Sequence, residues 1–265
     1  MQTLALVAVV QASLKDDISL ALQRIADNKS AEYNCTVSIA FKNADFTVPA
    51  AAGTVGLAAS KRAATVDDAF AWGSGTKPLT GASILKLVSE GRFGLESKVA
   101  PLIDPILARM AAADPKQSFK SMADLWGAEN VSGVTIGQLL NMTSGIPDFD
   151  TAKGYGSGPK TDSLRAELYS NPHKAYSPAE LMSVPWVAHH FKPCVDPKHG
   201  RYHKCYSSTN FMLLGLLLAN TTSWRDFSQG SYLPPSLASK LRFAVSGSTR
   251  TGGSNLPARP QTPDC

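Results

Sequence analysis

A serine and a lysine three residues apart are the clearest chemical feature of the sequence. Ser74 and Lys77 follow Gly73 in the segment FAWGSGTKPLTGASILKLVSEG, at the start of an apolar helical pattern that reaches Glu90. A serine hydroxyl is a poor nucleophile at neutral pH and needs an adjacent base. Side chains three residues apart share one face of a helix, so Lys77 can reach Ser74 and act as that base. Ser74 and Lys77 are therefore a candidate nucleophile and base, and the apolar pattern after them predicts a central, buried helix.

The same spacing occurs elsewhere in the chain, so it is not specific by itself. Ser83 and Lys86 lie in the middle of the expected helix, where no free backbone N–H groups are available. Ser157 and Lys160 lie in a Gly/Pro-rich loop that fixes neither side chain. Only Ser74 combines a glycine-led turn with a helix start, whose free N–H groups can hold a developing oxyanion. The alternative is a serine that caps the helix beside a surface lysine.

The elements around this pair follow from the hydrophobic pattern. TVSIAFK, residues 36–42, alternates apolar and polar positions and predicts a strand. FTVPAAAG, residues 46–53, predicts the returning strand, and Pro49 restricts it to a sheet edge or a bulge. A capping-box pattern at Ser13 predicts a helix before the two strands. Three later helices are expected to start at Thr135, at Ser177 and just after Tyr206.

Three segments together resemble the active-site motifs of one enzyme family. FAWGSGTKPLTGASILKLVSEG resembles the Ser-x-x-Lys motif of the serine β-lactamase and penicillin-binding-protein family, especially its class C and esterase branch. VTIGQLLNMTSGIPD is similar to that family's LLxHTSG segment. CYSSTNFMLLGLLL is similar to its Tyr-x-Asn segment and the helix after it. The three segments occur in family order, and the resemblance covers roughly residues 16–220.

The resemblance implies a role for each matched residue. Ser74 is the nucleophile that forms an acyl-enzyme, Lys77 helps to deprotonate it, and Tyr206 is the second proton-transfer group. Ser208 stands where the family has a substrate-binding asparagine, and its hydroxyl cannot offer an amide's donor and acceptor together. The expected function is a serine hydrolase that acts on a small-molecule or peptide acyl substrate, without a cofactor.

The family's third motif, Lys-Thr-Gly or His-x-Gly on a downstream strand, is not found. Arg250-Thr251-Gly252 comes too soon after Tyr206, and its neighbours have no strand pattern. We expect an α/β (α+β) fold of β-lactamase/transpeptidase type: an antiparallel sheet flanked by helices, with a helical subdomain and missing C-terminal strands. The expected domain spans residues 13–240, between a signal peptide at 1–12 and a disordered tail at 241–265. The alternative function is a catalytically impaired homologue, either a secreted binding protein or a remnant.

The cysteines offer two further interpretations. Cys194 and Cys205 are the natural disulfide pair in an oxidising compartment, although both can also be free thiols. His199 and His203 lie between them, which gives four potential zinc ligands within twelve residues. A proline and a glycine in this segment favour a loop over the helix that would align the histidines. The disulfide is therefore preferred and no metal is expected, with a zinc-stabilised interaction module as the alternative.

Charge and short patterns bear on partners and location. The net charge of +5 is spread over 265 residues without a basic run, so no nucleic-acid partner is expected. The apolar run 211–219 is too short to span a bilayer. An apolar run at 4–10 favours a secretory route. Separately, we expect the chain to be a monomer. Five of the nine asparagines lie in N-glycosylation patterns, at Asn28, Asn34, Asn130, Asn141 and Asn220.

Overall fold

The computed structural model divides the chain into two compact units, which are described separately. The first contains residues 1–71 and 254–265, and the second contains residues 72–253. The structure describes residues 2–56, 61–68, 73–150, 176–194, 205–221 and 233–239. The expected tail at 241–265, including Arg250-Thr251-Gly252, lies outside these residues, as does the boundary at 240.

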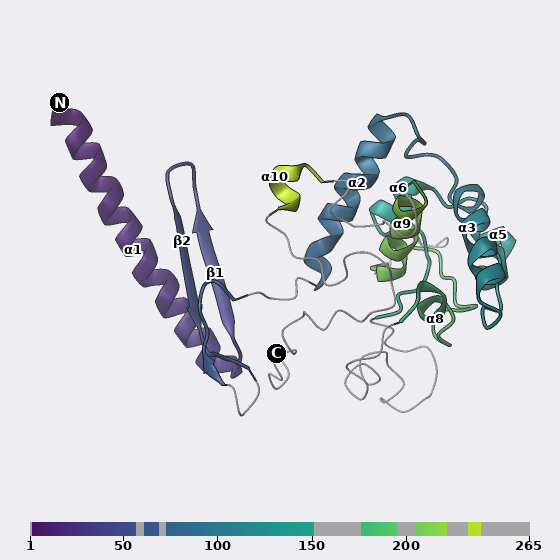
Figure 1. Cartoon of the computed structure of the whole chain (residues 1–265), viewed down its shortest axis with the longest axis horizontal. Helices are drawn as coiled ribbons and strands as arrows, with labels where there is room; N and C mark the ends of the chain where they lie inside the picture. The colour runs from purple at the N-terminus through teal and green to yellow at the C-terminus, as the bar shows by residue number, and fades with distance from the viewer. Residues whose placement is uncertain are drawn as a thin grey trace. The chain divides into compact units, whose positions relative to one another are not determined.

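The first unit contains a long helix and a β-hairpin. Helix α1 (Gln2–Tyr33) runs alongside strands β1 (Val37–Lys42) and β2 (Thr47–Ala52), as Figure 1 shows. The strands pair antiparallel from Val37 opposite Ala52 to Lys42 opposite Thr47. The expected order of helix, strand, turn and strand is confirmed. The expected helix start is wrong, because α1 begins at Gln2 and Ser13 lies inside it.

Local chemistry explains the hairpin. The Oδ1 atom of Asn43 accepts hydrogen bonds from the backbone N–H groups of Asp45, at 3.0 Å, and Phe46, at 2.8 Å, which close the turn. Pro49 lies opposite Ala40 in β2, and a two-stranded sheet has only edge strands, so the missing N–H is tolerated. Among the described residues of this unit, the buried apolar side chains are few and small: Ala26, Val48 and Ala50.

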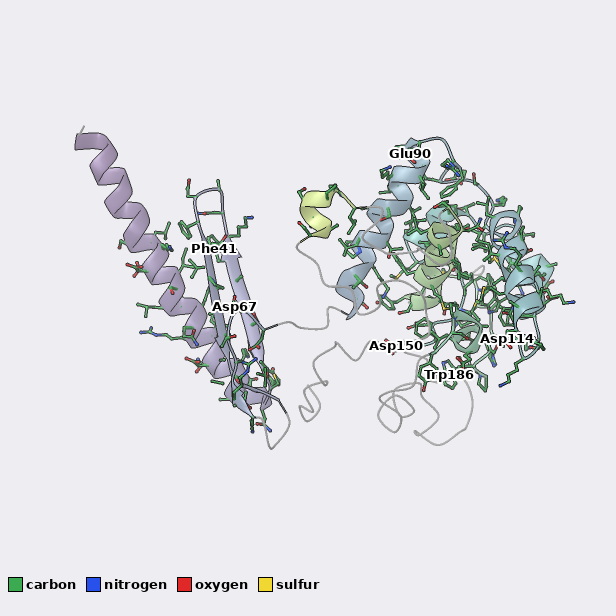
Figure 2. The ribbon with its side chains drawn as sticks, in the orientation of Figure 1. Phe41, Asp67, Glu90, Asp114, Asp150 and Trp186 are labelled. Carbon is green, nitrogen blue, oxygen red and sulfur yellow. A yellow bond between two sulfur atoms is a disulfide. The ribbon has the colours of Figure 1, made fainter. Side chains whose placement is uncertain are left out.

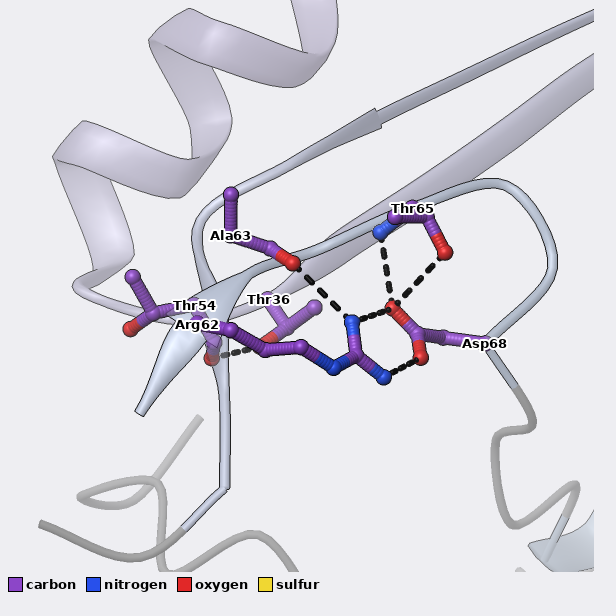
Figure 3. A network of polar contacts seen from close by, with 6 residues as sticks. All are labelled: Thr36, Thr54, Arg62, Ala63, Thr65 and Asp68. Atoms are coloured by element: carbon purple, nitrogen blue, oxygen red, sulfur yellow. Dashed lines mark hydrogen bonds and ion pairs between the residues drawn. The ribbon is translucent and has the colours of Figure 1, made fainter. Parts of the chain in front are cut away.

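A polar network follows the hairpin (Figure 3). Strands β3 (Thr54–Val55) and β4 (Arg62–Ala63) form a short antiparallel pair. The guanidinium of Arg62 forms an ion pair with Asp68, which also accepts the N–H of Thr65 at 2.7 Å. The hydrogen bond with Arg62 is the main cause that holds the pKa of Asp68 well below its usual range. These contacts fix the chain beyond the hairpin mainly through polar groups.

Helices make up most of the described residues of the second unit. A 3₁₀ turn, η2 (Gly73–Thr76), leads directly into α2 (Lys77–Ser89). The remaining described helices are α3 (Ala100–Ala113), α4 (Met122–Trp126), α5 (Ala128–Val131), α6 (Ile136–Leu140), α8 (Pro178–Met182), α9 (Ser208–Thr221) and α10 (Pro235–Ala238). Among the described residues, no helix combines the length and apolar character needed to cross a membrane.

Helix α9 is the centre of the second unit. Its sequence is apolar over most of its circumference, and it packs against α2, α3 and α6 (Figure 1). Each fully buried leucine contributes about 1.5–3 kcal/mol relative to an exposed one. The leucines of α9 that are buried in this core are Leu213, Leu214, Leu216, Leu217 and Leu218. The expected buried helix that follows Tyr206 is therefore confirmed.

Helix α2 is less buried than its sequence predicts. Ile84 and Leu87 lie in the core, whereas the Leu85 residue is 50% exposed. One face of α2 is therefore buried, not the whole circumference. The expected start at Ser74 is also imprecise, because Ser74 lies in the 3₁₀ turn and the α-helix starts at Lys77.

Two of the expected later helix starts are set by their caps. Thr135 and Ser177 each accept the N–H of the residue three positions on, Gln138 and Glu180, whose side chains bind back to the cap N–H. The helix that follows Thr135 ends at Leu140, earlier than the break expected at Ser144-Gly145. These capping boxes explain why short helices form at the predicted places.

Candidate active site

The turn before α2 brings Ser74 and Lys77 together. Gly73 has φ +49°, a left-handed conformation that glycine adopts without strain, and it starts the 3₁₀ turn. A 3₁₀ helix has three residues per turn, so side chains three positions apart lie directly above one another. The Lys77 ammonium nitrogen Nζ donates a hydrogen bond to Ser74 Oγ at 2.9 Å. The predicted pair is therefore in contact, although through a 3₁₀ turn.

Tyr206 completes a cluster of three polar groups. Its hydroxyl forms a hydrogen bond with Ser74 Oγ, across 132 residues of sequence. Lys77 Nζ lies 4.9 Å from the centre of the Tyr206 ring and 5.8 Å from that of Phe211. The Tyr206 residue is 37% exposed, so the cluster is open to solvent. Three predicted catalytic residues thus meet at one place.

The neighbours of Tyr206 change its acidity. Burial raises the pKa of Tyr206, but the hydrogen bonds with Lys77 and Ser74 and the positive charge of Lys77 outweigh burial. The net result is a pKa below the ordinary value for tyrosine. A more acidic phenol is a better proton donor to a leaving group and ionises at lower pH.

No side-chain hydrogen bond caps the start of α2. The Thr76 side chain does not cap the helix, and its Oγ1 instead donates to the carbonyl of Gly73 at 2.8 Å. Backbone N–H groups of a first helical turn have no partner within their helix. Such groups can stabilise an oxyanion next to a nucleophile.

Ser208 is the first residue of α9, two positions after Tyr206. Its backbone N–H donates to Asp148 Oδ1 at 2.9 Å, and its side chain is one of the hydrogen-bonding groups that lower the pKa of Tyr206. Ser208 is half-buried beside the cluster, where a substrate-binding group is expected.

The structure also places residues at the site that the sequence analysis did not select. The chain around Pro147 and Asp148 runs beside Ser207 and Thr209, and three hydrogen bonds join the two segments. In the sequence, the signal that could have identified these residues is that they are polar and lie within otherwise apolar segments. Their partners lie about sixty positions away in the sequence, so the pairing has no local pattern.

The cysteine pair is joined as a disulfide. Cys194 and Cys205 have Cα atoms 5.7 Å apart and their sulfur atoms are bonded, which confirms the predicted pair. Both thiols are therefore used, and the four-ligand zinc alternative is not formed. His199 and His203 lie outside the described residues, and no cluster of metal-binding side chains occurs in the part of the chain that the structure describes. The bond connects the residue before Tyr206 to the buried Cys194.

A solved structure has a similar fold. A D-stereospecific amidohydrolase from Streptomyces sp. matches with a TM-score of 0.50 and 21% sequence identity. The match covers 80% of this chain and 51% of the amidohydrolase, so the chain spans about half the length of that protein. At this identity the likeness shows the fold alone, and it agrees with the α/β class expected from the sequence. No curated protein matches the sequence.

A family model described as Beta-lactamase matches residues 37–264. The match includes all three motif segments and extends past residue 220 into the region 241–264, which the sequence analysis assigns to a tail. It covers most of the chain, and Ser74, Lys77, Tyr206 and Ser208 all lie within it. This chain therefore belongs to the β-lactamase family.

Proposed function

We propose that the chain is a serine hydrolase that transfers an acyl group to Ser74 and then to water. The observation that carries the proposal is the convergence of Ser74 Oγ with Lys77 Nζ, at 2.9 Å, and with the Tyr206 hydroxyl. Membership of the β-lactamase family supports a serine hydrolase that acts on small acyl substrates. The Streptomyces neighbour is described as an amidohydrolase, which favours an amide or a related ester as the substrate.

In the first step, Lys77 reacts as its neutral amine: Ser74 Oγ forms a bond to the carbonyl carbon while its proton passes to Lys77 Nζ. Backbone N–H groups of the turn that carries Ser74 stabilise the resulting oxyanion. The bond to the leaving group then breaks, and the leaving group takes a proton from Tyr206, which Lys77 restores. Water attacks the Ser74 ester by the reverse route: its proton is relayed through Tyr206 to Lys77, the ester bond breaks, and Ser74 Oγ takes this proton from Lys77.

Ser208 has a supporting role in this proposal. Its hydroxyl lies beside Tyr206 and offers one hydrogen bond to the bound substrate, in the place where the family's asparagine offers an amide. The substrate is therefore held by fewer polar contacts on this side than in the matched motif.

A covalent probe tests the proposal. The full chain is treated with a fluorophosphonate and with a fluorescent penicillin, and the adduct is located by peptide mapping. We expect one adduct, on Ser74. A folded chain that reacts with neither probe and hydrolyses no ester would instead support the alternative of an impaired homologue that acts by binding.

We also propose that the chain is a secreted glycoprotein. The Cys194–Cys205 disulfide is typical of an oxidising compartment. Asn28, Asn34, Asn141 and Asn220 are exposed. Asn130 is half-buried, and its side-chain amide donates to the carbonyl of Trp126 at 2.7 Å. A glycan replaces one of the two N–H bonds of this amide, and both donate here, to Trp126 and to Glu129, so this asparagine should have the lowest occupancy.

Expression of the full chain in secretory eukaryotic cells tests the location. Mass spectrometry after glycosidase treatment of the medium should find modified asparagines at exposed positions, with Asn130 as the internal control. Recovery of the protein only from the cytosol, with all five asparagines unmodified, would contradict the proposal.

A further inference from the structure

Two segments that are distant in sequence form a hydrogen-bonded seam next to Tyr206. We define this buried seam as residues Ser144–Asp148 together with Ser207–Asn210, the four residues that directly follow Tyr206. At its centre, Ser207 Oγ and Thr209 Oγ1 both donate to the carbonyl of Pro147, at 3.1 and 2.6 Å. The Pro147 carbonyl thus binds the first and the third residue after Tyr206.

The ends of the buried seam are also closed by hydrogen bonds. The N–H of Ser208 donates to Asp148 Oδ1 at 2.9 Å, and Ser144 Oγ donates to Asn210 Oδ1 at 2.8 Å. The side chains of Ser144, Asp148 and Asn210 belong to buried residues. Hydrogen bonds are stronger in such an environment, and the loss of one partner leaves a buried polar group unsatisfied at a cost of about 1–3 kcal/mol. The seam therefore has one strongly preferred arrangement.

Tyr206 depends on such anchors. It precedes α9, which begins at Ser208, and it is more than one-third exposed, so neither helix hydrogen bonds nor core packing hold it rigidly. On one side the disulfide connects Cys205 to Cys194. On the other side, Thr209 is fully buried and makes the shorter of the two bonds to Pro147.

We propose that Thr209 is a positioning residue: its hydrogen bond to the Pro147 carbonyl sets the Tyr206 hydroxyl against Ser74 Oγ. The effect on reaction rate rests on the proposed function, whereas the effect on the ionisation of Tyr206 does not. Lys77 is the charged group that faces Tyr206, and the tyrosine ionises more easily only while it stays near Lys77 and Ser74. If Tyr206 is displaced, its pKa should therefore rise towards the ordinary value for tyrosine.

The test compares three substitutions. Thr209→Val keeps the shape of the side chain and removes the donor, Thr209→Ser keeps the donor, and Thr221→Val is the matched control. Thr221 lies at the other end of α9, and its hydroxyl donates to the Leu218 carbonyl at 2.8 Å. Tyrosinate absorbance is titrated in each variant without substrate, and the same variant carrying Tyr206→Phe is subtracted to isolate Tyr206.

We expect Thr209→Val to raise the pKa of Tyr206 and to slow covalent labelling of Ser74 about tenfold, because a displacement of 1 Å can cost up to about 10²-fold in rate. Thr209→Ser should restore both quantities, and Thr221→Val should leave both unchanged. If Thr209→Val does not fold, Ser207→Ala removes the other donor to Pro147 and is measured in the same way. A Tyr206 titration that is identical in wild type and in the seam variant would overturn the positioning role. If wild type reacts with no probe, the proposed function fails, but the titration still decides the role of Thr209.

Discussion

Two serine–lysine pairs with identical spacing lie at the start and in the middle of the same helical segment. Ser74 and Lys77 contact each other and Tyr206. Nine positions later, Ser83 Oγ donates to the Leu79 carbonyl at 2.9 Å, and Lys86 forms an ion pair with Glu90, which Figure 2 labels at the end of α2. The partners of each group, rather than the spacing, decide which pair can do chemistry.

The position along the helix explains the difference. A serine in the middle of an α-helix has a backbone carbonyl four residues earlier that accepts its hydroxyl, as Leu79 does for Ser83. Ser74 lies before the first α-helical turn, and its hydroxyl instead meets Lys77 and Tyr206. Ser83 is buried in the core, whereas Ser74 is exposed to solvent and so to substrate.

Replacement of the two serines should give the largest contrast. Ser74→Ala should abolish labelling by the fluorophosphonate and lower ester turnover by about 10³-fold or more, because the attacking atom is lost. Ser83→Ala should label at the wild-type rate within about twofold and lose about 1 kcal/mol of stability with its hydrogen bond. Labelling rates and thermal melts measure the two effects. Equal residual hydrolysis in both variants would show that Ser74 is not the nucleophile.

Replacement of the lysines should give the next largest contrast. Lys77→Ala should slow acylation at neutral pH by about 10²–10⁴-fold, the usual contribution of a general base. Lys86→Ala should leave the rate unchanged, since it removes only an exposed ion pair with Glu90, worth about 0.3–0.5 kcal/mol. Single-turnover labelling of both variants measures the ratio. Similar losses in the two variants would remove the distinction between the pairs.

The ionisation of Tyr206 should separate the same two lysines. A nearby positive charge and a hydrogen bond to the phenolate favour the ionised form, so loss of Lys77 should raise the pKa of Tyr206. The tyrosinate should then appear at higher pH in Lys77→Ala, while Lys86→Ala should titrate like wild type. Absorbance titrations corrected with Tyr206→Phe measure this shift. An unchanged titration in Lys77→Ala would mean that this lysine does not tune the phenol.

Ser208→Asn should have the smallest effect. It restores the family's residue two positions after Tyr206, and an amide provides a donor and an acceptor where serine provides one hydroxyl. We expect kcat/KM for an ester substrate to stay equal or to rise by a few-fold, roughly the value of one hydrogen bond. Steady-state kinetics of wild type and variant measure it. A variant that folds normally yet loses all turnover would show that the motif around Tyr206 is matched incorrectly.

Local patterns predicted a large part of the molecule. The hairpin, the capped helix starts at Thr135 and Ser177, and the contact between Ser74 and Lys77 each depend on residues a few positions apart. The pairing of Cys194 with Cys205 was also predicted, because only eleven positions separate them. In each case turn geometry, capping or spacing is sufficient to state which groups meet.

Other features were decided only by the tertiary structure. The apolar pattern of α2 covers most of the helix circumference and predicted a central, buried helix, but neighbours cover only one face and leave Leu85 exposed. The proximity of Tyr206 to Ser74 was inferred from a family resemblance, because 132 residues separate them. The buried seam that joins Thr209 to the Pro147 carbonyl was not anticipated at all.

The sequence by itself determined which groups can react and which short elements carry them, because propensity, capping and spacing act within a few residues. Only the tertiary structure decided how a third polar group meets the Ser74–Lys77 pair and how that group is held. Contacts such as Ser74 with Tyr206, or Thr209 with Pro147, form when the core around α9 brings distant segments together. Their geometry depends on the packing of the whole unit, which no local stretch of sequence encodes.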